Sequence, residues 1–508
     1  MSATRSISVA LLLSAGCAFD PAGIPVSGVD ASDPEVSVVE GGQILDATSD
    51  VALDATGPGD AVHDVAPDWP AWDAGPGPDA WRDGPVDAPP TPDIVAPCPP
   101  TCPIACLPGS ATCPLPSNIS AGQLPAPCAA VTVPQGAVWR LCSNTSSSCR
   151  IVSGTDCNAA PTCAGSAVNQ TTAVGGTTIP ACAFAIVDLT VETGATLQVR
   201  GESPALLVVK GAATIAGLVD ASAQGRYGGA GGGDGGKVAT SGKGASGTGP
   251  VPGAGGQTCD CQTSEDNYDD CGGGGGGFST VGGAGGLEGG KFCSSGPEPL
   301  GGTSYGTDAL VPLLGGAGGG SGDVGNAAGA VPGDGGGGGG AIQISASSID
   351  LTGAILANGG PGGGGASSNN TYPGGGGGGG SGGGILLEAT TFGGTGWTMA
   401  AGGGGGGGGD DCSAGDGKQD KLVSGNEQAP TGGAGCNSGG DGGTGAYKTP
   451  PGSAGAGQNA GIWEGPGGGG GGAGRLRFNT IAAAVACPPA GLKTSASVSC
   501  GTMTVKAP

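Results

Sequence analysis

Histidine is nearly absent from this chain. Its 508 residues include only His63, which lies in a stretch dominated by Asp, Pro and Ala. The sequence therefore gives no support to a mechanism that needs a histidine base or a histidine metal ligand. Basic residues are scarce as well, with 17 Lys and Arg against 41 Asp and Glu and a net charge of −24. Such a chain repels nucleic acid, which is not expected as a partner.

Two enzyme motifs occur in forms that composition alone explains. Gly379 to Gly383 reads GGSGG and formally matches a nucleophile elbow around Ser381, but it lies in a glycine tract without a histidine partner. Gly242-Lys243 is not followed by Ser or Thr, so it is no Walker loop. We predict no catalytic residue from either motif.

The N-terminus has the order of an export signal. Arg5 supplies a positive charge, and residues 7–15 form a short, largely apolar run. That run is too short to span a bilayer. We therefore predict a signal peptide over residues 1–16.

The end of this signal resembles the lipobox of bacterial lipoproteins. The matching positions are Ala15, Gly16 and Cys17, whereas Ser14 stands where that family carries Leu and Leu13 lies one place earlier. The resemblance implies cleavage before Cys17, acylation of that cysteine and a membrane anchor. An ordinary signal peptide is the alternative.

Cysteine is abundant, with 19 residues. Without Cys17, 18 remain in even local groups, so local pairing would give nine disulfides in an oxidising compartment. Metal binding is the competing interpretation, but the chain has one histidine and no pair of CxxC motifs. The connectivity cannot be deduced. The disulfide candidates are Cys98, Cys102, Cys106, Cys113, Cys128, Cys142, Cys149, Cys157, Cys163, Cys182, Cys259, Cys261, Cys271, Cys293, Cys412, Cys436, Cys487 and Cys500.

Residues 17–97 are predicted to be a disordered tether. From Asp20 to Asp93 the chain holds 14 Asp and 2 Glu against Arg82 alone, so this stretch carries −15 of the net charge. Frequent proline and regular acidic residues prevent a packed core. Self-repulsion extends such a chain to a reach of at least about 50 Å.

Two cysteine-containing segments flank the main body. Residues 98–182 begin CPPTCPIACLPGSATC, and their proline content argues against helix. We predict a small cap stapled by disulfides there. Residues 481–508 form a tail that Cys487 and Cys500 would close.

Residues 183–480 contain short apolar cassettes that resemble one another. Each has period-two pairs, the pattern of strands with one buried face. Setting Gly217 on Gly353 aligns three pairs at once. The third cassette ends after a slip of one residue, and the fourth contributes one pair. The pairs are Leu206/Val208, Ala213/Ile215 and Val219/Ala221; Ile342/Ile344, Ile349/Leu351 and Ile355/Ala357; Ile385/Leu387 and Met399/Ala401; and Leu476/Phe478.

Each cassette has the size of one coil of a parallel β-helix, which buries its apolar face by stacking on its neighbours. We therefore predict an all-β chain with a short right-handed parallel β-helix, or solenoid. An antiparallel sandwich is the alternative. It is disfavoured because the strands recur in threes and no Asn-Gly hairpin turn lies between the strands of any one cassette.

Glycine-rich inserts separate the cassettes, at about residues 225–340, 359–383 and 402–474. They follow the third strand of each repeat, so stacking would project them from one side. Glycine chain is entropically costly to order. The inserts either stay mobile or pack as polyproline-II strands; the collagen triplet is absent, which excludes a triple helix.

Acidic residues give weak candidates for ligands. EDNYDD, over residues 265–270, could bind calcium through Glu265, Asp266, Asp269 and Asp270, although a solvated acidic loop is the simpler interpretation. No other cofactor is expected.

Paired carboxylates on a β-helix face serve some glycosidases and lyases. Asp220, Asp350 and Glu388 lie near cassette strands, but Asp220 and Asp350 do not share an aligned position. They therefore predict no catalytic pair.

The inserts resemble in composition the glycine-rich bacterial surface proteins termed PE-PGRS-like. The whole arrangement of lipobox, acidic tether, cysteine block and glycine-rich cassettes ending in GRLRF is similar to surface lipoproteins of myxobacteria. That resemblance, with Ala18 after Cys17, implies the outer membrane or cell surface of a Gram-negative bacterium.

The predicted role is structural or adhesive, without catalysis, and the predicted partner is a polysaccharide or another cell surface. The alternatives are a carbohydrate-active β-helix enzyme and an ice- or surface-binding protein. The sequence names no ligand.

Overall fold

The computed structural model describes residues 102–106, 113–145, 148–174, 177–239, 243–251, 253, 255–259, 270–289, 298–323, 330–367, 373–419, 429–447, 455–461, 464–481 and 486–506. The chain divides into two units at Asp87, and every described residue lies in the second, Ala88–Pro508. The predicted signal peptide, Cys17 and the tether lie outside the described residues. Within these residues, no helix has the length and apolar character needed to cross a membrane.

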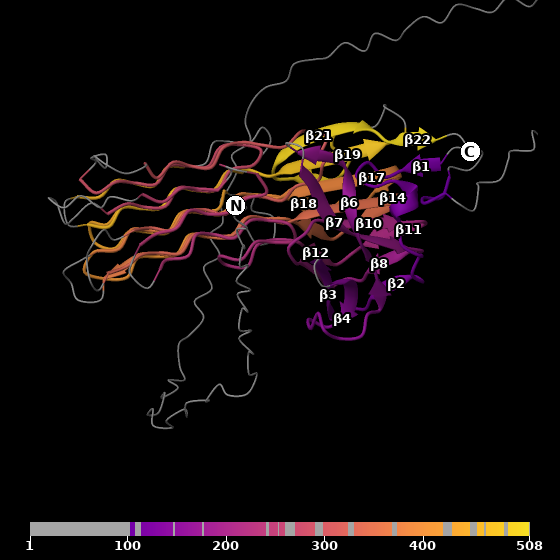
Figure 1. Ribbon diagram of the computed structural model, residues 1–508, viewed down its shortest axis with the longest axis horizontal. Helices are drawn as coiled ribbons and strands as arrows, with labels where there is room; N and C mark the ends of the chain where they lie inside the picture. The colour runs from indigo at the N-terminus through magenta and orange to yellow at the C-terminus, as the bar shows by residue number, and fades with distance from the viewer. Residues whose placement is uncertain are drawn as a thin grey trace, which may run out of the picture. The chain divides into compact units, whose positions relative to one another are not determined.

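The described residues form two mostly parallel sheets and no α-helix (Figure 1). The all-β class predicted from the sequence is therefore confirmed. The first sheet contains β2 (Val131–Val133), β6 (Ser166–Val174), β7 (Thr177–Ile186), β8 (Leu189–Val191), β10 (Ala205–Val209), β11 (Ala212–Ile215), β14 (Ala341–Leu351), β17 (Gly384–Gly393), β19 (Arg475–Thr480) and β21 (Ser497–Thr502). The second contains β3 (Val138–Asn144), β4 (Ser148–Ser153), β5 (Cys163–Ala164), β9 (Thr196–Arg200), β12 (Leu218–Asp220), β15 (Ala354–Leu356), β18 (Trp397–Met399) and β20 (Lys493–Thr494).

Two small antiparallel pairs and a single 3-10 turn complete the described elements. β1 (Cys113–Leu115) pairs with β22 (Thr504–Lys506), and β13 (Ala330–Val331) pairs with β16 (Ala366–Ser367). The turn, η1, spans Ala121–Gln123. The pair β1–β22 joins the two ends of the described chain.

The segment predicted as a cap, residues 98–182, supplies the first strands of both sheets. β2 pairs in parallel with β8, and β3 pairs in parallel with β9. Its other pairs, β3–β4, β4–β5 and β6–β7, are antiparallel. These antiparallel strands cover the end of the stack at which the chain enters it.

The cassette register agrees with the alignment at two of three strands. β11 pairs with β14 and β12 with β15 as Gly217 on Gly353 requires. At the first strand the alignment was wrong by one residue, because Leu207, and not Leu206 or Val208, lies opposite Ile344. Between the paired stretches the β10–β11 side has one residue more than β14, which shifts the register.

The slip predicted in the third cassette was also wrong. Thr398 lies opposite Ile355, and Met399 lies opposite Leu356, in the same register that β17 keeps with β14. Ala400, and not Ala401, then joins Ala357 in the core. Thr398 is fully buried, and its hydroxyl lies 3.3 Å from the Lys493 carbonyl oxygen, so a polar residue fills an inward position.

The sheets bury apolar side chains on more than one face. The main core fills the space between them and includes Phe184, Leu207 and Ile344. A second core lies on the opposite face of the first sheet, where Leu206 and Leu386 pack with Phe278 and other residues of the chain that covers it. Because β10 is buried on both faces, alternation could not fix which of its residues point inward.

The described parts of the glycine inserts are packed segments that lie side by side on one side of the strands (Figure 1). Within residues 373–384 no glycine has a positive φ. Gly376, Gly379 and Gly382 donate in turn to the carbonyls of Pro466, Gly469 and Gly472, at 2.9 Å each. Bonding to one neighbour at every third residue is the period of a polyproline-II helix. Of the two states left open by the sequence, the ordered one is present.

The other residues of this segment bond in other directions. Gly377 and Gly380 donate to Gly363 and Gly360, while Gly378 donates to Gly320. The carbonyls of 374–381 accept from three further segments, so the helix has six neighbours, as in a hexagonal array. The six are 270–278, 314–323, 333–340, 357–365, 400–409 and 466–474.

This packing requires glycine in the interior of the bundle. A Cβ placed on Gly377, Gly380 or Gly383 would come closer than 3.0 Å to a backbone carbonyl of the neighbouring helix. On an outer helix, every third residue faces solvent and can carry a side chain. Asp441 and Thr444 are exposed there, whereas the two glycines between them are not.

Seven disulfides join cysteines within the local groups seen in the sequence. They are Cys102–Cys113, Cys128–Cys163, Cys142–Cys157, Cys149–Cys182, Cys259–Cys271, Cys412–Cys436 and Cys487–Cys500. Cys106 is also disulfide-bonded, while Cys98, Cys261 and Cys293 lie outside the described residues. These bridges indicate an oxidising compartment outside the cytoplasm.

We predict that Gly380→Ala destabilises the protein by about 1–3 kcal/mol, because its methyl group meets a backbone carbonyl that no side-chain movement can clear. Gly415→Ala is the matched control, since the nearest atom to a Cβ there is 3.3 Å away. The measurement is denaturant unfolding of both variants. Equal stability of the two would contradict the close-packed bundle.

We also predict that reduction lowers the melting temperature by more than about 10 °C, since each bridge contributes about 2–4 kcal/mol. Circular dichroism melts with and without a phosphine reductant test this. A melting curve that reductant leaves unchanged would show that the bridges do not support the fold.

Candidate functional site

A groove follows the corner at which the chain passes from the first sheet to the second. Successive turns stack there through backbone hydrogen bonds: Leu218 donates to Ala195, Ala354 donates to Gly217 and Trp397 donates to Gly353, each at 2.9 Å. The groove therefore crosses several strands at right angles. Its volume is about 370 Å³.

Small residues line most of this groove. The lining consists of Gly194, Ala195, Thr196, Ala216, Gly217, Leu218, Thr352, Gly353, Ala354 and Trp397. A Cβ on Gly217 or Gly353 would come closer than 3.0 Å to the backbone of the preceding turn. Glycine is therefore needed for the turns to stack closely at this corner.

Trp397 forms one end of the groove. The first residues of the second-sheet strands lie in one row, in which Leu218, Ala354 and Trp397 are neighbours in register. Lys493 is next in this row, and its ammonium nitrogen lies 4.6 Å from the centroid of the Trp397 ring. A half-buried indole beside small residues offers a flat apolar surface for a ring-shaped ligand.

The outer face of the second sheet becomes charged toward the earlier strands. Arg200 forms an ion pair with Asp220 at 2.6 Å, and Arg140 donates to Gln198 at 2.8 Å. Burial lowers the pKa of Arg140, and the positive charge of Arg200 lowers it further. Asp220 is thus a structural partner of an arginine.

The three strand carboxylates do not converge. Asp220 belongs to the second sheet, whereas Asp350 lies on β14 opposite Gly393 and is exposed. Glu388 lies on β17 between Ser345 and Asn479 in register. The structure therefore brings together no carboxylate pair from these residues.

Glu388 is fully buried and surrounded by donors. Its Oε2 accepts from Gln343 Nε2 at 2.7 Å, from Ser345 Oγ at 2.7 Å and from the Ser117 amide at 3.1 Å. Its Oε1 accepts from Asn479 Nδ2 at 2.9 Å and from the Ser117 hydroxyl. This network joins three strands of the first sheet to the covering segment at Ser117, so Glu388 holds that cover in place.

Two arginines on β19 lie near this network. Arg477 Nε donates to Asn479 Oδ1 at 2.8 Å, and burial lowers the pKa of Arg477 against the opposing effects of Asp308 and Glu388. Burial lowers the pKa of Arg475 too, although Asp308 forms an ion pair with it. Burial also raises the pKa of Tyr305 well above its usual value, and its hydroxyl donates to Gly315 at 2.5 Å.

Ser381, the centre of the GGSGG motif, is fully buried in the glycine bundle. Its hydroxyl accepts from the Ala317 amide at 2.8 Å and lies 3.0 Å from the Gly277 carbonyl. The motif is part of a polyproline-II helix and not of a strand-to-helix turn, so Ser381 is a packing residue.

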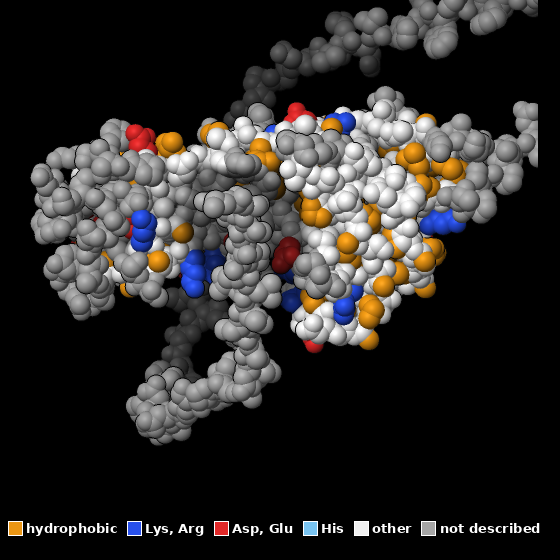
Figure 2. Space-filling model, in the orientation of Figure 1, with side chains coloured by type: hydrophobic (Ala, Val, Ile, Leu, Met, Phe, Trp, Pro, Cys, Tyr) orange, Lys and Arg blue, Asp and Glu red, His pale blue; other side chains and the backbone are white. Residues whose placement is uncertain are grey.

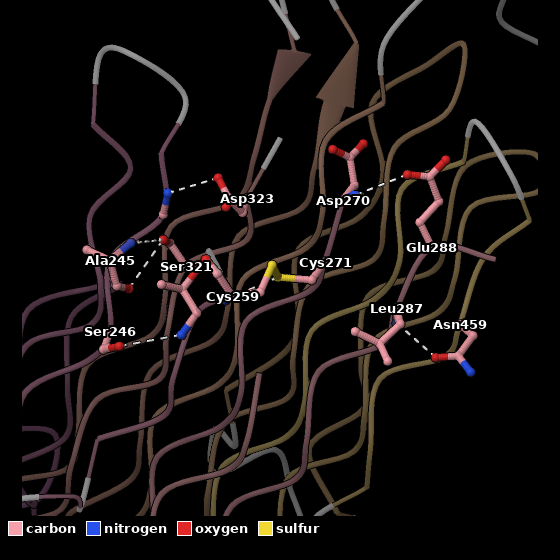
Figure 3. The surroundings of a disulfide bond; sticks show 12 residues. Ala245, Ser246, Cys259, Asp270, Cys271, Leu287, Glu288, Ser321, Asp323 and Asn459 are labelled. Carbon is pink, nitrogen blue, oxygen red and sulfur yellow. Dashed lines mark hydrogen bonds between the residues drawn. A yellow bond between two sulfur atoms is a disulfide. The ribbon is translucent and has the colours of Figure 1, made fainter. Parts of the chain in front are cut away.

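Of the calcium candidates, Asp270 is described, and Glu265, Asp266 and Asp269 lie outside the described residues. Asp270 is buried beside the Cys259–Cys271 disulfide, and its amide donates to Glu288 Oε2 at 3.0 Å (Figure 3). In the part of the chain that is described, the sole cluster with metal-ligand spacing is Cys102, Cys106 and Cys113, which are disulfide-bonded.

No protein-family model, no curated protein and no solved structure matches this chain.

The groove and the place of Trp397 in it were not predicted from the sequence. The available signal was positional: a glycine precedes the second-sheet strand in three cassettes, at Gly217, Gly353 and Gly396, and Trp397 follows the last of them. Figure 2 shows hydrophobic side chains scattered over the strand region on the face in view.

We predict that Glu388→Gln destabilises the protein by about 2–3 kcal/mol, because an amide cannot accept from all of the donors that face the carboxylate. Asp350→Asn, at an exposed position on a strand, is the control and should change stability by less than about 0.5 kcal/mol. Denaturant unfolding measures both. A stable Glu388→Gln variant would mean that the cover is held by apolar contacts alone.

Proposed function

We propose that this protein is an exported lipoprotein, anchored through an acylated Cys17, that binds extracellular polysaccharide without altering it. Its place would be the outer surface of a Gram-negative cell, with the tether of residues 17–97 spacing the folded unit from the membrane. The role is structural or adhesive. The disulfides and the lipobox-like sequence support the compartment and the anchor respectively.

The proposed architecture of the folded unit is a short right-handed β-solenoid. Three successive turns of the chain pass from the first sheet to the second, as β11 to β12, β14 to β15 and β17 to β18, and each strand pairs in parallel with its equivalent. The glycine inserts leave after β12, β15 and β18 and return into β14, β17 and β19. Each insert therefore completes one coil.

The observation that carries the proposed function is the groove ending at Trp397. It crosses consecutive coils, which suits a linear polymer better than a compact ligand. Its floor repeats at the strand spacing of about 4.8 Å, close to the length of one sugar ring in an extended glycan. Its volume of about 370 Å³ falls in the range of small-ligand sites.

The carboxylates support binding over cleavage. Glycoside hydrolysis needs two carboxyl groups on opposite sides of one bond. Asp220 is held by Arg200, Glu388 is enclosed by donors, and neither belongs to the lining of the groove. The proposal therefore assigns the groove to recognition.

We predict that the oxidised full chain is retained by some members of a panel of bacterial and plant polysaccharides, without release of reducing or unsaturated ends. Trp397→Ala should lower retention at least about tenfold, while Trp397→Phe keeps part of it, because stacking area is lost in that order. Retention and end groups are measured in the same tubes.

Tyr227→Ala is the control, since Tyr227 is likewise an aromatic residue beside a cation, Arg226, but it is exposed and lies away from the groove lining. Melting curves of all variants separate misfolding from lost binding. Retention that survives Trp397→Ala would remove the groove from the function, and release of ends would make the protein an enzyme.

A further inference from the structure

We infer that the groove selects an acidic saccharide, whose ring stacks on Trp397 while its carboxylate pairs with Lys493. This inference rests on the proposed function and adds the chemical class of the ligand. It starts from the cation that stands at the aromatic end of the groove.

Lys493 is placed over the ring by strand pairing. β20 pairs in parallel with β18, which sets Lys493 directly opposite Trp397 on the same face. Its ammonium is exposed and lies 4.6 Å from the ring centroid. Among the described residues, no acidic group forms an ion pair with it, so the contact with the ring is its only charge-related interaction given by the structure.

A ligand that stacks on Trp397 either displaces this ammonium from the ring or binds beside it. A neutral sugar that displaces it loses the cation–π contact and gains no charge interaction in return. A sugar with a carboxylate can keep the ammonium near the ring and pair with it, since both partners then remain at the aromatic edge. The arrangement therefore favours a uronic acid over a neutral sugar of the same shape.

Lys493 belongs to a segment of the chain without acidic residues. From Arg475 to Pro508 the sequence contains Arg475, Arg477, Lys493 and Lys506 and no Asp or Glu, although the whole chain carries −24. β19, β20 and β21 all belong to this basic segment. Arg475 pairs with Asp308 and Arg477 donates to Asn479 on the first sheet, so within this segment Lys493 is the cation beside Trp397.

The test compares ligands that differ only in charge. Trigalacturonate and trimannuronate are titrated into the oxidised full chain beside their methyl esters, which keep the ring and linkage and lose the carboxylate. At low salt the acids should bind roughly three- to fivefold more tightly than the esters, as for an exposed ion pair, and the difference should shrink as salt is raised.

Variants assign the difference to one residue. Lys493→Gln should bring the acids to the affinity of the esters, and Lys493→Arg should keep the preference. Lys418→Gln, at another exposed lysine on the glycine bundle, is the matched control and should change nothing. Melting curves confirm that the variants fold.

The outcomes separate the inference from the proposed function. Esters that bind as well as acids, through Trp397, would overturn the acidic preference and leave polysaccharide binding standing. An acid preference that survives Lys493→Gln would overturn the role of Lys493. No binding of either series, together with no retention on the panel, would overturn the proposed function itself.

Discussion

The folded unit depends on hydrogen bonds that glycine helices exchange sideways through their backbones. A polyproline-II helix forms none within itself, so an isolated insert would leave its peptide groups to water and gain nothing for its lost entropy. Residues 373–383 satisfy theirs by donating to three neighbours and accepting from three others. The inserts must therefore fold together, and they do so from ends that are fixed where the bundle runs into β14, β17 and β19.

The strands were the predictable part of the fold. Gly217 and Gly353 located equivalent turns correctly, because a glycine that the stacking requires marks the same corner in each cassette. The first strand was misaligned because β10 is buried on both faces. Apolar residues then occupy every position of the strand, and their alternation cannot show which ones point into the main core. The slip in the third cassette was wrong because Thr398, a polar residue, fills an inward position that the pattern assigns to an apolar one.

The glycine bundle could not be derived residue by residue. A run of identical residues carries no side-chain pattern that would tell one register from the next, so neighbours such as Gly380 and Gly360 are fixed by the strands at the base of the bundle. The usable signal lies on the outer helices. There Asp441 and Thr444 stand three residues apart and face solvent, as the period of three requires. The buried network at Glu388 was likewise hidden, since Ser117 lies far from it in sequence.

Glycine permits close backbone packing at two places in this chain, the bundle and the corner, and in both a backbone carbonyl occupies the space of the absent side chain. In the bundle, a carbonyl of the next helix fills the space beside Gly380, and the interior is closed. At the corner, backbone carbonyls of the preceding turn fill the space beside Gly217 and Gly353, and the groove runs along these stacked turns. Trp397 carries the largest side chain along this row, and strand pairing places Ala354 and Lys493 on either side of it. A ligand in the groove therefore contacts a surface whose shape the stacking of the turns already requires. Trp397 and Lys493 add an aromatic ring and a positive charge to that surface.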